Sequence, residues 1–221
     1  MEEDYTDYTD GVTPPPASRT PRRTLREEQV AETRSSLVAS GRRLFGEKGF
    51  AATSVEDLAR EARVTTGALY HHFPTKTALF ESVFEQVHGK LLEASARAAA
   101  VATDEIEALV RGFEAFLDSV LEPDVQRIII TDAPAVLGLS RFTELDERYA
   151  FAAIVAALEA AVESGKLRVD DPETLARLLL GALTRGGMLI ASSPDATTTR
   201  DAVATVMRDL LEGLSIDTRD R

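Results

Sequence analysis

The sequence contains no cysteine, no tryptophan and only three histidines, His71, His72 and His88. The lack of cysteine excludes disulfides, thiolate metal sites and a cysteine nucleophile. Side chains of adjacent helical residues point about 100° apart, so the histidine pair does not favour a metal site. The most apolar stretch, residues 178–191, is broken by Arg185, and we expect no membrane span. The polar, acidic first residues argue against a secretory signal and so predict a cytoplasmic protein. We expect no bound cofactor.

Positive charge is scarce overall but is concentrated in one segment. The formal net charge is -12, which by itself argues against nucleic-acid binding. Residues 19–77 nevertheless carry a small positive excess, whereas the segments before and after them are acidic. This asymmetry predicts a small basic module attached to a larger acidic body.

The first 18 residues have almost no large aliphatic side chains. They contain the repeat DYTDYTD and a run of three prolines. Such a segment cannot bury enough apolar surface to offset the entropy lost on ordering. The sequence therefore predicts a disordered acidic tail over residues 1–18, although Tyr5 and Tyr8 leave a partner motif open as an alternative.

Helical patterns fill the chain after Leu25, and strand alternation is missing. Capping residues, prolines and glycines divide these patterns into nine helices and predict an all-α fold. We expect a helix-turn-helix domain over residues 19–80 and a larger helical domain over residues 81–221. The expected helices cover about 26–48, 54–62, 66–72, 76–99, 104–122, 123–134, 140–165, 172–191 and 194–213.

The segment Ser54–His72 reads as two short helices joined by a tight turn. Thr53 begins a capping-box pattern that ends at Glu56, and Thr65 can cap the second helix. The apolar residues can form a small core, namely Val55, Leu58, Ala59, Val64, Leu69 and Phe73. In a helix-turn-helix the second helix enters the major groove. Its outward residues would be Thr65, Thr66, Gly67, Ala68, Tyr70 and His71.

Cations flank this pair of helices. Lys76 lies in the first turn of the next helix, where the helix dipole disfavours a cation unless a phosphate is near. Upstream, four arginines form a basic arm, namely Arg19, Arg22, Arg23 and Arg26. The arm could contact DNA or could simply make the segment soluble, and both readings stay open.

A long motif runs from Gly49-Phe50 through Thr53-Ser54-Val55-Glu56-Asp57-Leu58-Ala59 to Val64-Thr65-Thr66-Gly67-Ala68-Leu69-Tyr70-His71-His72-Phe73-Pro74-Thr75-Lys76. This motif resembles the DNA-binding domain of the bacterial TetR repressors. The resemblance covers about residues 27–80. It implies an all-α homodimer with a variable ligand-binding domain. It also implies that Thr53, Tyr70 and Lys76 contact phosphates, and that Thr66, Gly67, Ala68 and His71 face bases.

The larger domain offers candidate ligand-binding residues but no motif for a ligand class. Aromatic and polar side chains that could line a cavity are Phe113, Phe116, Arg127, Thr131 and Phe151. The aromatic residues could equally be filled core, and Arg127 could pair with Asp132. A separate acidic series at helical spacing, Glu107, Glu114, Asp118 and Glu122, is expected to be a solvated face.

The last two helices carry more apolar surface than a terminal pair needs. The candidate dimer-interface residues are Leu178, Ala182, Leu189, Val203, Val206 and Leu210. Gly181, Gly186 and Gly187 would let helices approach closely in a four-helix interface between two copies. The alternative is that both helices cover the core of their own subunit.

These patterns and the resemblance together predict a ligand-responsive transcriptional regulator that binds double-stranded DNA as a homodimer. That it represses transcription is implied by the resemblance alone. Two other classes remain as alternatives. One is a helix-turn-helix used for protein contact, and the other is an all-α enzyme. The enzyme is disfavoured because the sequence shows no nucleophile–base pair, no metal cluster and no phosphate-binding glycine loop.

Overall fold

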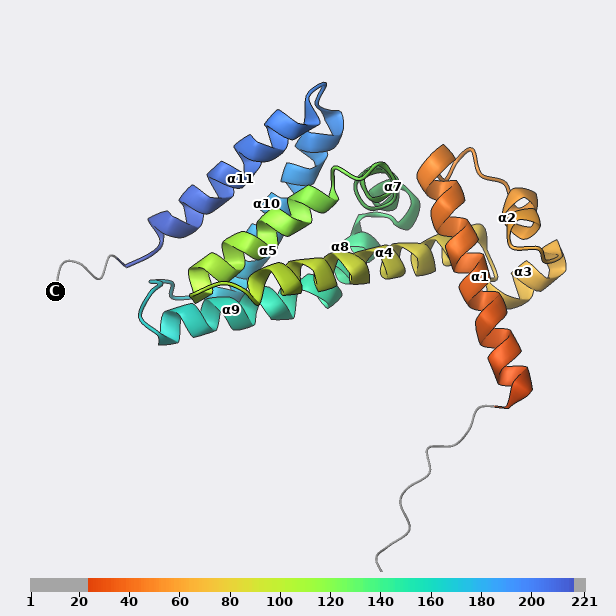
Figure 1. Cartoon of the computed structure of the whole chain (residues 1–221), viewed down its shortest axis with the longest axis horizontal. Helices are drawn as coiled ribbons and strands as arrows, with labels where there is room; N and C mark the ends of the chain where they lie inside the picture. The colour runs from red at the N-terminus through yellow and green to blue at the C-terminus, as the bar shows by residue number, and fades with distance from the viewer. Residues whose placement is uncertain (1–23, 217–221) are drawn as a thin grey trace, which may run out of the picture.

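The computed structural model describes residues 24–216, and this part of the chain folds into helices (Figure 1). The predicted acidic tail, Arg22 and Arg23 lie outside the described residues. The first four helices are α1 (Leu25–Lys48), α2 (Val55–Glu61), α3 (Thr66–His72) and α4 (Lys76–Ala99). The remaining elements are α5 (Glu105–Ser119), α6 (Pro123–Val125), η1 (Gln126–Asp132), α7 (Ala133–Leu137), α8 (Leu139–Asp146), η2 (Glu147–Phe151), α9 (Ala152–Glu163), α10 (Pro172–Ser192) and α11 (Ala196–Gly213).

Two of the long helices contain π-helical turns. In the second domain α6, η1 and α7 run on from one another, as do α8, η2 and α9. Gly138 separates the two runs with a φ of +77°, a conformation that glycine adopts without strain. Counted as continuous segments, the described residues form the nine helices that the sequence predicts. The π turns were not predicted, because such turns are rare and occur as short insertions within α-helices.

Side-chain caps set the boundaries of the short N-terminal helices. The hydroxyl oxygens of Ser54, Thr65 and Thr75 accept hydrogen bonds from backbone N–H groups three residues further on, at 3.0–3.1 Å. The predicted cap at Thr53 is therefore wrong by one residue, since Ser54 is the N-cap of α2. Val30 of α1 is 46% exposed, because α1 extends beyond the other helices there (Figure 1).

An aromatic cluster joins the N-terminal helices to α4. The Phe80 ring lies 5.3 Å from Phe45 and 5.3 Å from Phe50, in edge-on contacts. Phe45 and Phe80 are fully buried. From this cluster α4 runs into the second domain and packs along α5 (Figure 1). Its 24 residues span about 36 Å, so one rigid element connects both domains.

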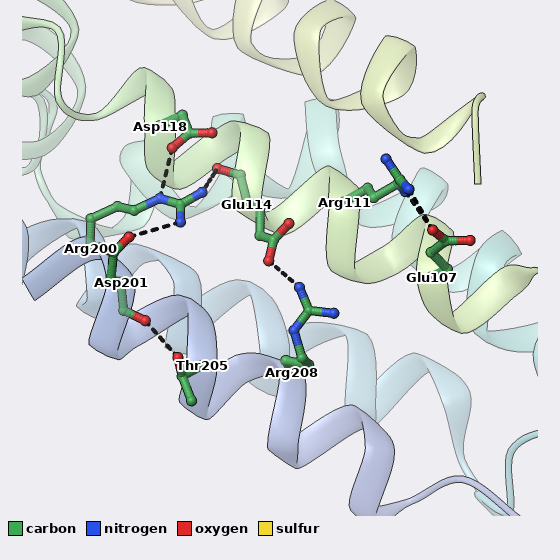
Figure 2. Close-up of polar contacts among 8 residues, drawn as sticks. All are labelled: Glu107, Arg111, Glu114, Asp118, Arg200, Asp201, Thr205 and Arg208. Carbon is green, nitrogen blue, oxygen red and sulfur yellow. Dashed lines mark hydrogen bonds and ion pairs between the residues drawn. The ribbon is translucent and has the colours of Figure 1, made fainter. Parts of the chain in front are cut away.

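Figure 2 shows that the acidic residues of α5 face arginines of α11. Asp118 forms an ion pair of 2.7 Å with Arg200, and Glu114 pairs with Arg208. The expected solvated acidic face is thus wrong for Glu114, which is half-buried because α11 packs against α5, whereas the Asp118 side chain is 60% exposed as expected. Glu107 instead pairs with Arg111 on α5, and hydrogen bonds from Thr103 and Arg111 lower its pKa to about 2.

The outer faces of α10 and α11 carry an exposed apolar stripe. Leu178 and Leu189 of α10 and Val206 and Leu210 of α11 are 44–67% exposed. The other two predicted interface residues, Ala182 and Val203, are half-buried. We refer to these six residues as the α10–α11 stripe.

Two of the three glycines expected at this interface pack inside the subunit instead. A Cβ atom on Gly186 would lie 2.6 Å from Val203, and one on Gly187 would lie 2.7 Å from Ile130. Gly181 is exposed. Helix α10 is also the single described helix that is long and apolar enough to cross a membrane. A core helix of a bundle passes the same test, and α10 packs against α9, α11 and η1.

Candidate DNA interface and ligand cavity

Helix α3 presents the side chains that the sequence assigned to DNA. Thr65, Thr66, Gly67 and His71 are exposed, Tyr70 is 50% exposed, and Ala68 is half-buried. Small residues in the first turn allow a helix to approach base edges closely, and hydroxyl groups can bond to bases or phosphates. The structure therefore gathers these six residues on one short helix and its cap.

The inner side of α3 fixes its position. Leu69 is fully buried, and Phe73 follows as the C-cap. The Arg34 guanidinium lies 4.2 Å from the centre of the Phe73 ring and donates to the backbone carbonyl of His72 at 3.3 Å. Burial, and secondarily the positive charges of His71 and Arg34, lowers the pKa of His72, so this imidazole is neutral at pH 7. Sequence reasoning missed this role of Arg34.

Lys76 has an internal role that the sequence did not predict. Its ammonium donates to the carbonyls of Phe50 and Thr53, both at 2.9 Å, and lies 4.1 Å from the centre of the Phe50 ring. An ammonium has three donors, so one N–H remains for a phosphate. The ammonium also ties the loop between α1 and α2 to the start of α4.

Thr53 cannot contact a phosphate through its hydroxyl in this structure. The side chain is 1% exposed and donates to the carbonyl of Gly49 at 2.8 Å. The phosphate contact implied for this hydroxyl is therefore corrected to an internal bond. It closes the loop that follows α1, where Gly49 has a φ of +81°.

Replacement of Lys76 tests this internal role. We expect Lys76→Ala to lower the free energy of unfolding by about 1–3 kcal/mol, because two buried carbonyls lose their partner. Chemical denaturation measures this change. Lys48→Ala, an exposed lysine in the last turn of α1, is the matched control and should change stability by less than about 0.5 kcal/mol. Equal stability of the Lys76 variant and wild type would contradict the internal role.

The five predicted ligand-binding residues do not lie in one cavity. Phe113 and Phe116 line an apolar cavity of the second domain. Arg127 and Thr131 line a separate groove between η1 and the end of α1. Phe151 stacks against the guanidinium of Arg177, 4.4 Å from its ring centre. The prediction of one shared site is wrong because η1 turns Arg127 and Thr131 toward the first domain.

The groove between the domains is crossed by two polar contacts. Arg42 of α1 pairs with Asp124 of α6 at 2.8 Å. The Asp132 carboxylate accepts a hydrogen bond from the backbone N–H of Phe50 at 2.7 Å. These contacts join the DNA-binding module to η1 and its neighbours independently of α4.

The apolar cavity lies among α4, α5, α9 and α10 and has a volume of about 150 Å³. Large apolar side chains form part of its wall, including Leu91, Phe113, Ile154 and Leu183. Small residues form much of the rest, namely Ala96, Ala99, Ala108, Gly112, Ala150, Ala153 and Ala157. Most small-molecule sites are apolar concavities of this kind with a few polar groups.

Three polar side chains from three helices meet at this cavity. His88 of α4 shares a hydrogen bond of 2.9 Å between its Nε2 and Oδ1 of Asp146 at the end of α8. The Thr184 hydroxyl of α10 lies 3.3 Å from the second Asp146 oxygen. We call His88, Asp146 and Thr184 the polar triad. Sequence reasoning missed it, because its members are 38 or more residues apart and each looks unremarkable alone.

Comparisons with known proteins agree with this arrangement. The family "Bacterial regulatory proteins, tetR family" matches residues 37–83, and "Tetracyclin repressor-like, C-terminal domain" matches residues 106–214. A crystal structure of a TetR-family transcriptional regulator from Pectobacterium atrosepticum is 33% identical to the chain. It superposes with a TM-score of 0.78, over 89% of this chain and 100% of that one.

The chain belongs to the TetR family. It is therefore a helix-turn-helix DNA-binding transcriptional regulator, and the resemblance inferred from residues 27–80 is confirmed.

Further TetR-family relatives agree with the assignment. The Transposon Tn10 TetC protein of Escherichia coli is 29% identical over 155 residues, which are 70% of this chain and 78% of that protein. The repressor KstR2 of Rhodococcus jostii is 29% identical over 182 residues, covering 76% and 81%. The structure of RolR in complex with resorcinol superposes with a TM-score of 0.68 at 18% identity, over 83% of this chain and 89% of that one. It shows the shared fold alone.

Proposed function

We propose that this chain is a cytoplasmic repressor that binds a near-palindromic operator as a homodimer and leaves it when a small-molecule effector binds. The observation that carries the proposal is the exposed, small and hydroxyl-bearing side of α3 on a TetR-family fold. An enzyme is disfavoured by the family, and a protein-contact role for the module is the remaining alternative.

On the operator, Thr66, Gly67, Ala68 and His71 would face bases, while Thr65 and Tyr70 would contact phosphates. The remaining N–H of Lys76 would reach a phosphate, and Arg22 and Arg23 of the basic arm would add contacts from outside the described residues. Contacts to base edges specify sequence, and contacts to phosphates position the protein.

Two substitutions on α3 separate these roles. Thr66→Ala and His71→Ala should each relax the preference at particular base pairs by about 1–3 kcal/mol, because a direct base contact is lost. Tyr70→Phe should weaken binding to all sequences alike. Fluorescence anisotropy on a panel of operators with single base changes measures both effects. A uniform loss for Thr66→Ala and His71→Ala would make them backbone contacts.

The α10–α11 stripe would form the dimer interface. Its exposed leucine and valine side chains lie on the outer faces of α10 and α11. Burial of this surface against the same surface of a second subunit gives a four-helix interface. The family acts through dimers, which supports the choice of a second copy as the partner.

Effector binding would reach α3 through α4 and through the contacts across the groove. His88 and Leu91 of α4 line the cavity, while Lys76 at its start holds the loop before α2. A shift of α4 would change the distance between the two α3 helices of a dimer, and both half-sites would no longer be met together. An effector does this only if it binds the released state more tightly, and operator DNA must then weaken effector binding by the same factor.

Salt dependence tests the DNA-binding role against the protein-contact alternative. Operator affinity should fall steeply between low and moderate salt, because phosphate contacts release counterions. Anisotropy titrations at several salt concentrations measure the slope. A partner protein bound through an apolar face of the module, with no salt-dependent DNA binding, would overturn the proposal.

A further inference from the structure

One buried polar atom of the polar triad lacks a hydrogen-bond partner. The His88 side chain is 4% exposed, and its Nδ1 atom is fully buried without a partner among the residues that the structure describes. A buried nitrogen without a partner destabilises a fold, so such a group asks for an explanation such as a ligand. His88 lines the apolar cavity.

The neighbours of His88 determine which role Nδ1 can play. In the tautomer that donates from Nε2 to Asp146, the Nδ1 atom is a hydrogen-bond acceptor. One Asp146 oxygen bonds to His88, and the other lies 3.3 Å from the Thr184 hydroxyl, whose single proton is nearer to the Leu180 carbonyl, at 3.1 Å. Nδ1 of His88 is the buried atom of the polar triad without any partner, and its complement is a hydrogen-bond donor.

The imidazole is also held in place. Its ring centre lies 5.4 Å from that of Phe84 and 5.3 Å from that of Tyr149. Burial raises the pKa of Tyr149, so its ring adds no charge beside His88. A π-helical turn, η2, begins directly after Asp146, and π turns inside helices frequently mark functional sites.

Size and charge restrict the ligand further. An apolar cavity of about 150 Å³ in another protein binds benzene, which sets the scale of one ring. Among the described residues, no arginine or lysine lines the cavity, and the one carboxylate in its wall belongs to Asp146. An anion would therefore meet a like charge without a cation to offset it.

We propose that this cavity binds a neutral ligand of about one ring whose hydroxyl or N–H group donates a hydrogen bond to Nδ1 of His88. The alanines and Gly112 leave room for the ring, and the polar triad selects the donor. The inference deepens the effector-binding role proposed above, and it rests on that role for the choice of this cavity.

Phenol and benzene are the probes, because phenol carries one hydrogen-bond donor, its hydroxyl group, that benzene lacks. Dissociation constants for the full chain without DNA, from ligand-observed NMR, should show phenol binding about tenfold more tightly than benzene. In His88→Phe the affinity for phenol should fall to that for benzene, while the affinity for benzene should change less than about threefold. Equal binding of the two probes by wild type, or a phenol advantage that survives His88→Phe, would overturn the proposal.

A second pair of variants does not depend on the stability of His88→Phe. A Cβ atom on Gly112 would meet only the Ser95 carbonyl, at 3.7 Å, so Gly112→Leu should fold and fill the cavity. It should lose binding of both probes. Gly89→Leu on α4, outside the cavity wall and with open space around its Cβ, is the matched control and should bind as wild type does. Retained binding in Gly112→Leu would place the ligand elsewhere.

Benzoate tests the charge. It should bind at least tenfold more weakly than phenol, and tighter binding of benzoate would overturn the neutral-ligand assignment. Because DNA is absent from these titrations, their outcome is independent of operator release. If phenol binds but the operator affinity is unchanged, the proposed release of the operator is contradicted, whereas the proposed ligand site at His88 is not.

Discussion

The double substitution Leu178→Glu and Val206→Glu is expected to give monomers that lose operator binding. Both side chains are more than half exposed on the α10–α11 stripe, and two glutamates per subunit would place four charges in the apolar centre of the proposed interface. Linked half-sites commonly add about 10²- to 10⁴-fold in avidity, and the monomer would lose this factor. Sedimentation velocity and anisotropy measure the two effects.

Leu139→Glu is the matched control for this prediction. Leu139 is 75% exposed but lies at the start of α8, outside the stripe. The control should remain dimeric and bind the operator as wild type does. A double variant that is monomeric and still binds the operator tightly would contradict the dimer as the DNA-binding form.

Phe80→Ala is expected to lower the free energy of unfolding by about 3–5 kcal/mol. Phe80 is fully buried, and its ring makes edge-on contacts with both Phe45 and Phe50. The substitution removes the ring that fastens α1 and the loop after it to α4, and it leaves a cavity there. Chemical denaturation followed by circular dichroism measures the loss.

Leu139→Ala, at the same exposed residue, is the matched control and should change the free energy of unfolding by less than about 0.5 kcal/mol. A change below about 1 kcal/mol for Phe80→Ala would mean that this aromatic cluster does not fasten α4 to the N-terminal helices. The proposed transmission through α4 would then lose its mechanical basis.

Local signals made the N-terminal module predictable from the sequence. Capping residues such as Thr65 and Thr75 act within one helical turn, and the predicted bounds of α3 and α4 agree with the structure. The small core around Leu58 and Leu69 follows from apolar spacing alone. The prediction of Thr53 as the N-cap was wrong because Thr53 and Ser54 are both good caps. The Thr53 hydroxyl bonds instead to the carbonyls of Leu44 and Gly49, which leaves Ser54 to cap α2.

The ligand cavity was not predictable in the same way. Six alanines form part of its wall, and in a sequence an alanine indicates only a good helix former. His88, Asp146 and Thr184 meet through the packing of three helices, and sequence spacing carries no trace of that. Arg127 and Phe151 were chosen by residue type, and both lie in π-helical segments that the sequence analysis did not predict.

Selection of binding sites from random double-stranded DNA tests the central claim most directly. The protein should enrich a near-palindrome whose half-sites are about 34–36 Å apart, or a multiple of that distance, because two α3 helices related by a two-fold axis read it. Repeating the selection with Thr66→Ala should relax particular positions in both half-sites symmetrically. Enrichment of no sequence, or of a single unrepeated half-site, would contradict a dimeric regulator that reads its operator through α3.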